Sequence, residues 1–315
     1  MMTATESVCP VCLARLPAWR EQDGDDGWLV RTCPEHGLFR TRYWRGPPGP
    51  QGWDRPKIPK PGTEPIGAAP GPGCPCVCGL CPEHHQRTCT VVLEVTSRCN
   101  LGCPVCFADA GEDAHDPGLA AIGARLIQAR KQAGPANLQL SGGEPTVRAD
   151  LPDIVAAAKA AGFPFVQCNT NGLALAADPG LAPRLAAAGL DSVFLQCDGV
   201  SDAVHINLRG RPLAREKRAA MEACFAAGIG VVLVATLVPD VNVAEVGELV
   251  RLAARLAPGV RGVHFQPAAC FGRYPGDGAS APRLTLPELM AALEAQTGGE
   301  VLAADFHAPC CEHSL

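Results

Sequence analysis

The sequence lacks the charge pattern of a nucleic-acid-binding protein. Its 315 residues include 27 lysines and arginines against 32 acidic residues, so the formal net charge is -5 and no stretch is rich in basic residues. Proteins that bind nucleic acid usually present a concentrated positive surface to the phosphate backbone. We therefore expect no nucleic acid among the partners of this chain.

Long hydrophobic runs are also missing, and the first residues do not resemble a signal peptide. The longest apolar stretch, around Ile229 to Val238, has the length of a strand, whereas a membrane helix needs about 18 apolar residues or more. The first ten residues, MMTATESVCP, contain neither the basic nor the apolar region of a signal peptide. We expect a cytoplasmic protein without a transmembrane segment, in which 47% hydrophobic residues fill a sizeable core.

Cysteine, in contrast, is abundant. The chain has 17 cysteines, most of them in clusters with short spacings. Such clusters form disulfide frameworks in small secreted proteins, but a long chain without an export signal is expected in a reducing compartment. There, closely spaced cysteines indicate metal binding.

Residues 1–45 are predicted to form a small metal-binding β knuckle. Cys9 and Cys12, followed by Cys33 and His36, have the C-x2-C and C-x2-H spacing of a closed tetrahedral site, in a zinc-ribbon-like or rubredoxin-like module. Short strands are expected at 28–30 and 38–44, after a polar turn at 23–27. Zinc is the default metal, and a mononuclear iron fits the same ligands. Free surface thiols are the weaker alternative, because so short a module has too small a hydrophobic core to fold without a bound metal or another cross-link.

Residues 46–90 are predicted to be a linker that ends in an auxiliary metal site. The stretch 46–73 is too rich in proline and glycine to form a regular element. Closely spaced thiols follow it, and the C-terminal segment 271–315 contains two more that could complete their ligand set. We expect an auxiliary iron-sulfur cluster or clusters, with a second zinc site as the alternative. The candidate ligands are Cys74, Cys76, Cys78, Cys81, Cys89, Cys310 and Cys311.

Residues 91–270 show the pattern of βα units around a parallel sheet. Short β-branched runs alternate with alanine-rich helical stretches, several of which end at glycine. We predict strands at 91–96, 137–141, 165–169, 192–197, 230–237 and 262–266, and helices at 117–133, 151–161, 179–188, 212–227 and 243–256. Six such units predict an α/β fold, a partial (β/α)6 barrel rather than a closed barrel of eight. The single Cys168, Cys197, Cys224 and Cys270 are predicted to be small core residues.

Three closely spaced cysteines directly follow the first predicted strand. Cys99, Cys103 and Cys106 have C-x3-C-x2-C spacing. They are expected at the carboxyl ends of the strands, where barrel enzymes have their active sites. Three thiolates can hold three irons of a [4Fe-4S] cluster and leave the fourth iron without a protein ligand. The alternative is a structural zinc loop, which would require a fourth ligand nearby.

Polar residues follow the other predicted strands at the same end. Glycines let the backbone approach a ligand, a carboxylate accepts hydrogen bonds from an ammonium group, and amides suit a ribose or a carboxylate. The alternative is that these segments are ordinary turns, and His264 is expected to be a packed residue rather than a catalyst. The candidates are Gly142, Gly143 and Glu144 after the second strand, Asn169 and Asn171 after the third, Gln196 and Asp198 after the fourth, and Gln266 at the sixth.

The cysteine triad followed by Phe107, together with Ser141-Gly142-Gly143-Glu144-Pro145, resembles the radical S-adenosylmethionine (radical SAM) superfamily. The resemblance implies that the open iron binds S-adenosylmethionine and that one electron from the [4Fe-4S] cluster cleaves it to a 5'-deoxyadenosyl radical. It also implies that Phe107, the Gly-Gly-Glu segment and the polar strand ends contact the cofactor. A reductase, ferredoxin or flavodoxin is the expected electron donor.

A closer resemblance covers the chain from Cys9 to Cys311. Segments such as 78–84, 96–108, 140–146, 169–172, 208–212 and 265–267 resemble radical SAM proteins with an N-terminal metal knuckle, which include archaeal tetraether lipid synthases and pterin-methylase-like proteins. The resemblance implies hydrogen abstraction from an unactivated carbon, for carbon-carbon bond formation or methylation on a lipid-like or pterin-like substrate. A lipid substrate would involve transient membrane contact. Relatives of this kind continue past the position of Leu315 with further cysteines and another domain.

Two other functions fit the same sequence. A radical SAM maturase that modifies a peptide would use auxiliary clusters equally well, and it would bind a small precursor peptide. A non-catalytic iron-sulfur electron carrier would bind the clusters but would not cleave S-adenosylmethionine. Formation of 5'-deoxyadenosine separates this last alternative from both enzymes.

Overall fold

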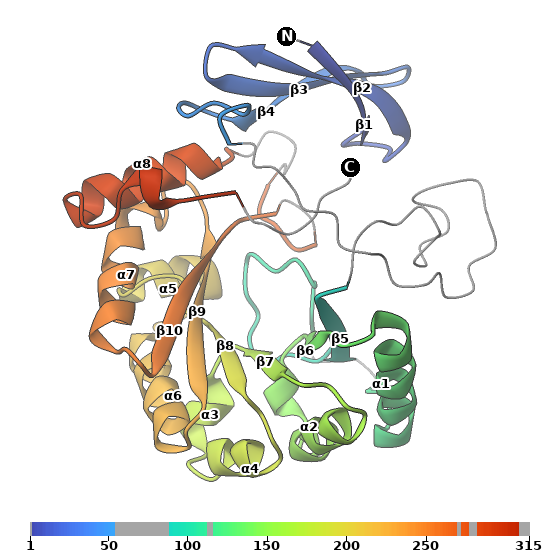
Figure 1. The fold of residues 1–315 in the computed structure, drawn as a ribbon, viewed down its shortest axis with the longest axis vertical. Coiled ribbons are helices and arrows are strands. Elements are labelled where there is room, and N and C mark those ends of the chain that lie inside the picture. Colours follow the sequence, from blue (N-terminus) through green and yellow to red (C-terminus); the bar gives the residue numbers. More distant parts are fainter. Residues whose placement is uncertain (1, 54–87, 112–115, 270–271, 277–281, 309–315) are drawn as a thin grey trace.

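The computed structural model describes residues 2–53, 88–111, 116–269, 272–276 and 282–308. Two separate sheets make up this part of the chain, one near the N-terminus and one in the middle and C-terminal parts (Figure 1). Several of the cysteines considered above lie outside the described residues, namely Cys74, Cys76, Cys78, Cys81, Cys270, Cys310 and Cys311.

The N-terminal module is a four-stranded antiparallel sheet in the order β1-β2-β3-β4. Its strands are β1 Met2–Val8, β2 Arg15–Asp23, β3 Asp26–Cys33 and β4 Gly37–Trp44. The two expected strands lie within β3 and β4, and the polar turn joins β2 to β3. β1 and β2 were not predicted, because β1 has no buried residue and becomes a strand by pairing with β2 along its whole length.

The second sheet has six strands, all parallel, in the order β10-β9-β8-β7-β6-β5. All six coincide with the predicted strands, and the predicted α/β fold with a partial (β/α)6 barrel is confirmed. Because all six strands are parallel, their carboxyl ends lie at one edge of the sheet. The bounds are β5 Thr90–Thr96, β6 Asn137–Gly142, β7 Val166–Thr170, β8 Ser192–Gln196, β9 Gly230–Leu237 and β10 Val260–Pro267.

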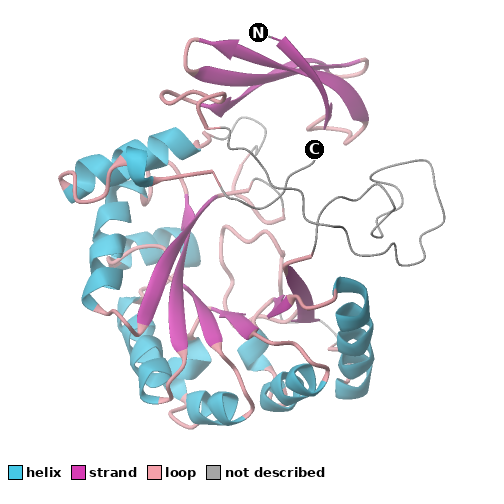
Figure 2. Ribbon diagram, in the orientation of Figure 1, coloured by secondary structure: helices cyan, strands magenta, loops and turns pink. Residues whose placement is uncertain are grey.

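Helices cover the outer face of this sheet (Figure 2). Each of the five predicted helices is present, as α1 Leu119–Ala133, α2 Leu151–Ala160, α4 Leu181–Ala187, α6 Ala214–Ala226 and α7 Val246–Arg255. Three further helices were not predicted, α3 Leu173–Ala177, α5 Asp202–Arg209 and α8 Leu286–Thr297. Short 3-10 turns lie at Pro145–Val147, Val243–Glu245 and Ala303–Asp305. Within the described residues, no helix is long and apolar enough to cross a membrane.

The main hydrophobic core lies between the parallel sheet and these helices. Outward-facing strand residues pack against one apolar face of each covering helix, as expected for strands with helices on one side. Cys168, Cys197 and Cys224 are buried in this core, as predicted. Fully buried members of the core include Leu138, Leu140, Val166, Val193, Leu195, Val231 and Leu233 from strands, and Ile122, Ile154, Leu185 and Leu249 from helices.

Candidate functional site

The three cysteines of the triad lie in the loop after β5, residues 97–111, which we call the cluster loop. Cys103 is buried, and Cys99 and Cys106 are half-buried. Apolar side chains from the loop and from two helical segments pack around them, namely Leu101, Leu173 and Leu213. The thiols therefore sit in a largely apolar pocket at the edge where the strands end.

Backbone contacts give the cluster loop its shape. Cys106 and Arg273 exchange two backbone hydrogen bonds, each of 2.8 Å, and the Arg273 Nε donates to the carbonyl of Cys103 at 2.8 Å. At its root, the loop closes on itself through a hydrogen bond of 3.1 Å from the Cys99 amide to the carbonyl of Gly111. The chain itself thus fixes the positions from which the cysteines project.

A network of ion pairs supports the start of the loop. The Asp116 carboxylate accepts hydrogen bonds of 2.5 Å from Thr96 Oγ1 and from the Arg98 guanidinium. The hydrogen bonds from Arg98 lower the pKa of Asp116. The buried Arg148 donates to the carbonyl of Val95 at 3.0 Å. These contacts hold the carboxyl end of β5 in place, where the cluster loop begins.

The Gly-Gly-Glu segment after β6 lies directly against the cluster loop. A Cβ atom on Gly142 would be 2.0 Å from the carbonyl oxygen of Thr96, and one on Gly143 would be 2.2 Å from that of Arg98. Gly142 also has a φ of 127°, which side chains rarely permit. The amides of Gly143 and Glu144 donate to these same carbonyls at 2.8 Å. Both glycines are therefore needed for the two loops to meet.

The Glu144 carboxylate joins the loops after β6 and β7. It is 1% exposed, and its Oε1 accepts from the amide of Thr146 at 3.0 Å and from the hydroxyl of Thr170 at 2.7 Å. Its Oε2 accepts from the amide of Asn171 at 2.5 Å. Its described contacts are thus with the chain itself, and the predicted contact with a cofactor ammonium group stays a prediction.

Asn171 connects the strand ends to the cluster loop. Its Nδ2 donates to the side chain of Asn100 at 2.8 Å, and its carbonyl accepts from Lys217 Nζ at 2.6 Å. Lys217 also donates to Gln196 Oε1 at 3.0 Å. Burial lowers the pKa of Lys217 to about 8, despite nearby Cys197. Lys217 was not predicted as a site residue, since nothing in the sequence of α6 distinguishes it from a surface lysine.

Asn169 leaves one polar atom without a partner. Its Nδ2 donates to Ser141 Oγ at 3.3 Å, while its Oδ1 is buried and has no hydrogen-bond partner among the described residues. Such an atom is rare in a folded protein and costs stability unless a ligand satisfies it. Asn169 therefore offers an acceptor at the strand ends that fits an ammonium or hydroxyl group of a bound molecule.

Asp198 is fully buried and forms an ion pair with Arg209. Arg209 donates two hydrogen bonds of 2.7 Å to the two carboxylate oxygens, and its Nη1 donates to the carbonyl of Val105 at 3.1 Å. Burial opposes the charge of Arg209, but Asp198 outweighs burial and raises the pKa of the guanidinium. Asp198 therefore reaches the cluster loop through Arg209, and a direct contact with cofactor stays a prediction.

The remaining predicted site residues are more exposed. Phe107 is 59% exposed, and Gln266 and Cys89 are exposed as well. His264 is exposed, and its ring lies 5.8 Å from that of Phe194 on the neighbouring strand. Cys89 precedes β5, and its carbonyl accepts a hydrogen bond of 2.9 Å from the amide of Asn137 at the start of β6, so it lies at the opposite edge of the sheet from the triad.

The triad fits an iron-sulfur cluster by its chemistry. Burial raises the pKa of Cys99, and the nearby Glu144, Cys103 and Cys106 raise it further. Three thiolates so close together in apolar surroundings need a positively charged group between them.

The knuckle, in contrast, forms a compact tetrahedral donor set. All donor atoms of Cys9, Cys12, Cys33 and His36 lie within 4.8 Å of one another. The Cys12 and Cys33 sulfurs are 3.8 Å apart, and the Cys33 sulfur is 3.4 Å from His36 Nδ1. Zn–S bonds of about 2.3 Å and Zn–N bonds of about 2.0 Å in a tetrahedron give about 3.8 Å and about 3.5 Å for these separations.

The electrostatics of the knuckle favour a bound cation. Burial raises the pKa of Cys9, but hydrogen bonds from the amides of Cys12 and Val11 and from neighbouring thiols lower it to about 6. A thiolate is the form that binds metal. The predicted metal site is thus formed by all four predicted ligands.

Comparisons with known proteins agree with both sites. A family model described as the radical SAM superfamily matches residues 93–253, and one described as the HMPTM N-terminal zinc ribbon domain matches residues 1–45. The chain is 38% identical over 312 residues to 7,8-dihydro-6-hydroxymethylpterin dimethyltransferase of Methanocaldococcus jannaschii, which covers 98% of this chain and 61% of that protein. It is 30% identical over 195 residues to GTP 3',8-cyclase of Paenarthrobacter nicotinovorans, covering 60% of this chain and 54% of that protein.

The fold is also similar to solved structures. Streptococcus suis SuiB bound to S-adenosylmethionine superposes with a TM-score of 0.54 at 17% identity, covering 68% of this chain and 49% of that chain. At this identity the likeness concerns the fold alone. The chain therefore spans less than two thirds of the length of each of these relatives.

Proposed function

Because this chain belongs to the radical SAM superfamily, we propose that it methylates an unactivated carbon of a small pterin-like molecule. One observation supports this substrate class above the others. The 38% identity to the pterin dimethyltransferase extends over the knuckle and the barrel together, and covers 98% of this chain. A lipid substrate, as in the tetraether synthase resemblance, has no such support.

We assign the cluster to Cys99, Cys103 and Cys106, which would hold three irons and leave one open. When bound, the [4Fe-4S] cluster supplies one electron to the sulfonium of S-adenosylmethionine, which yields methionine and a 5'-deoxyadenosyl radical that can abstract hydrogen from carbon. The apolar side chains around the triad exclude water from the cluster.

Other residues bind the cofactor or hold the site in shape. Asn169 Oδ1 accepts a hydrogen bond from the ammonium or a hydroxyl of the cofactor. Lys217 positions the backbone of Asn171 and the side chain of Gln196 through its two hydrogen bonds. Gly142 and Gly143 keep the β6 loop in contact with the cluster loop.

The test is cleavage of S-adenosylmethionine by the full chain, with reconstituted clusters and a strong reductant. We expect 5'-deoxyadenosine from one molecule of S-adenosylmethionine, whose methyl group stays on methionine. Methyl transfer to 7,8-dihydro-6-hydroxymethylpterin therefore requires a separate methyl donor in the assay, such as a second molecule of S-adenosylmethionine, and a second electron from the reductant. Replacing the three cysteines of the triad together with alanine removes about four irons per chain and all cleavage, while the knuckle metal stays. If a fully loaded, reduced protein formed no 5'-deoxyadenosine, it would be an electron carrier; cleavage with modification of a peptide only would refute the pterin substrate.

The role of Asn169 is tested separately. Asn169→Ala is expected to raise the KM for S-adenosylmethionine by about tenfold, the effect of one hydrogen bond to a charged group. Asn137→Ala is the matched control, since this exposed asparagine lies at the opposite end of β6. Equal KM values in the two variants would contradict the role.

A further inference from the structure

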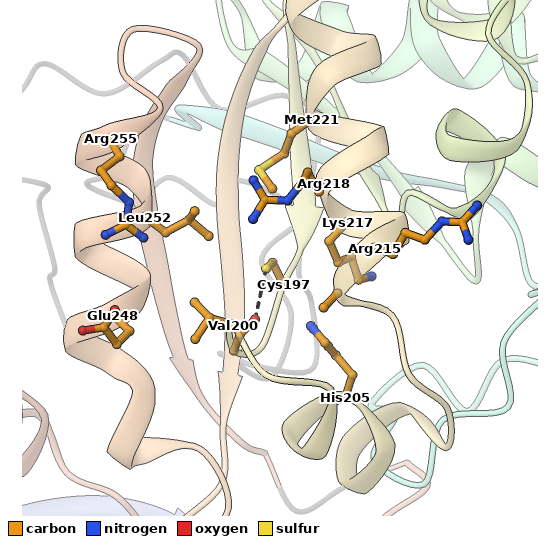
Figure 3. A pocket seen from close by; sticks show the side chains of 12 residues that line it. Cys197, Val200, His205, Arg215, Lys217, Arg218, Met221, Glu248, Leu252 and Arg255 are labelled. Carbon is orange, nitrogen blue, oxygen red and sulfur yellow. Dashed lines mark hydrogen bonds between the residues drawn. The ribbon is translucent and has the colours of Figure 1, made fainter.

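A second cavity lies away from the cluster loop. It has a volume of about 360 Å³ and lies between α5, α6 and α7, next to the end of β8 (Figure 3). α5 separates it from the cluster loop, because Val204 and Leu208 of α5 pack against Val105 of that loop, whereas His205 lines the cavity. None of the residues assigned above to the cluster or to the cofactor lines this cavity, although Lys217 does.

The charges around this cavity are mostly positive. Arg215 and Arg218 of α6 and Arg255 of α7 line it, and none of the three forms an ion pair with a described residue. The acidic residue of the lining, Glu248, is already paired with Arg251 at 2.7 Å. In Figure 3 the guanidinium groups of Arg218 and Arg255 lie beside the cavity, whereas that of Arg215 points away from it. Two exposed guanidinium groups thus border the cavity without an acidic partner among the described residues.

His205 provides an independent sign of a ligand. Its side chain is completely buried, and neither ring nitrogen has a hydrogen-bond partner among the described residues. Burial lowers its pKa, and the charge of Lys217 lowers it further, so the ring is neutral and offers one N–H donor. In Figure 3 the ring points into the space between α5 and α6. A buried imidazole without partners is costly unless a ligand satisfies it.

We propose that this cavity binds a phosphate group carried on a small molecule with an apolar part. Arginine forks match the oxygens of phosphate, the pair Arg218 and Arg255 suits a doubly charged group better than a carboxylate, and the His205 N–H supplies a further donor. Met221 and Leu252 form the apolar part of the lining. This site is additional to the proposed methylation site, and its occupancy does not depend on the cluster.

The first experiment measures binding of inorganic phosphate to the full chain by calorimetry, at constant ionic strength set with chloride. We expect saturable binding of one phosphate per chain, tighter than that of acetate. Arg218→Ala and Arg255→Ala should each weaken it by about tenfold, whereas Arg125→Ala, at an exposed arginine of α1, should change it by less than about twofold. Absence of saturable binding, equal binding of acetate, or binding that the cavity variants retain would overturn the proposal.

A second variant guards against misfolding. His205→Leu removes the unpartnered ring, so it should raise the unfolding midpoint of the phosphate-free chain and weaken phosphate binding by about tenfold or more. Loss of phosphate binding in a more stable protein cannot come from unfolding. If His205→Leu lowered the midpoint and bound phosphate normally, the imidazole would have a structural role and the proposal would fail. Neither outcome depends on cleavage of S-adenosylmethionine.

Discussion

At the scale of single residues, two glycines determine whether the site can assemble. The Thr96 carbonyl lies where a Cβ on Gly142 would have to be, and the backbone of both loops is fixed by hydrogen bonds. The sequence motif indicated a close approach of backbone to a ligand. The structure shows an approach of backbone to backbone, which places the two loops side by side, and the approach to a ligand stays a prediction.

Gly142→Ala is therefore expected to destabilise the protein by about 3 kcal/mol and to reduce both iron content and 5'-deoxyadenosine formation. Urea denaturation and iron analysis measure these effects. The control is Gly123→Ala within α1, where a Cβ would meet nothing within 4 Å. That change should stabilise the protein by about 0.5–1 kcal/mol, because alanine favours a helix over glycine. Similar effects at the two positions would argue against the close contact.

Lys217 leads to a prediction about pH. Its folded-state pKa of about 8 is below the ordinary value of 10.5, so between these values the unfolded chain binds more protons and stability rises with pH. Below about pH 8 the charged ammonium is present in both states and its burial costs about 3 kcal/mol. The stability contributed by the neutral amine is lost as the pH falls through 8.

Lys217→Met should thus be more stable than the wild type at pH 7, and this advantage should shrink as the pH rises to about 10. Denaturation curves of both proteins at pH 7 and 10 measure the difference. The same variant should cleave S-adenosylmethionine more slowly, since Asn171 and Gln196 lose their shared donor. A stability difference that did not change with pH would show that the lysine is not buried in charged form.

At the scale of elements, α5 joins the cluster loop to the sheet. One face of α5 packs on Val105, and Arg209 in its last turn pairs with Asp198 just after β8. Breaking such a buried pair leaves an uncompensated charge, which costs more than the pair itself contributes.

Arg209→Met should therefore cost about 3–5 kcal/mol in stability, and the double variant Arg209→Met with Asp198→Asn should cost less than the two single changes added together. The double variant should also show an altered electron paramagnetic resonance spectrum of the reduced cluster, because Val105 loses its donor. Additive costs would mean that Asp198 and Arg209 act independently.

The same elements show what the sequence could and could not predict. The strands were predicted correctly because their β-branched and leucine residues are buried under the covering helices and give short apolar runs in the sequence. α5 and α8 were missed although their caps are visible in the sequence, as Ser201 with Gly210 and as Thr285 with Glu288 and Gly298.

The site was predicted in part. The triad, the glycines and the knuckle ligands have diagnostic spacings within short segments. Arg209, Arg273 and Lys217 reach the site from far along the chain, and only the fold brings them there. Asn169 was predicted by its place at a strand end, but its unpartnered oxygen could be seen only in three dimensions.

At the scale of the whole molecule, the knuckle and the barrel depend on metal to different degrees. The buried apolar cluster next to the metal ligands of the knuckle consists of Cys9, Leu16 and Cys33, two of which are ligands themselves. The barrel has an extensive core of its own. An exposed ion pair of 2.7 Å between Arg45 and Glu288 of α8 is one contact between the two parts.

Removal of the knuckle metal by a chelator, or Cys33→Ala, should abolish the structure of residues 2–44 and leave the barrel folded. Hydrogen exchange should show rapid exchange in β1 to β4 with unchanged protection in β6 to β9, and the iron of the cluster loop should be retained. Loss of protection throughout the chain would mean that the knuckle is required for the barrel to fold.

The contacts of the cluster loop bear on how the protein matures. Arg273, Arg209 and the amides after β6 hold this loop through bonds that belong to the polypeptide alone. We therefore expect that a [4Fe-4S] cluster can enter the folded barrel without unfolding it. The knuckle, whose small core consists largely of its own metal ligands, is expected to bind its ion while it folds. The two metals would then be inserted at different stages, one during folding and one after it.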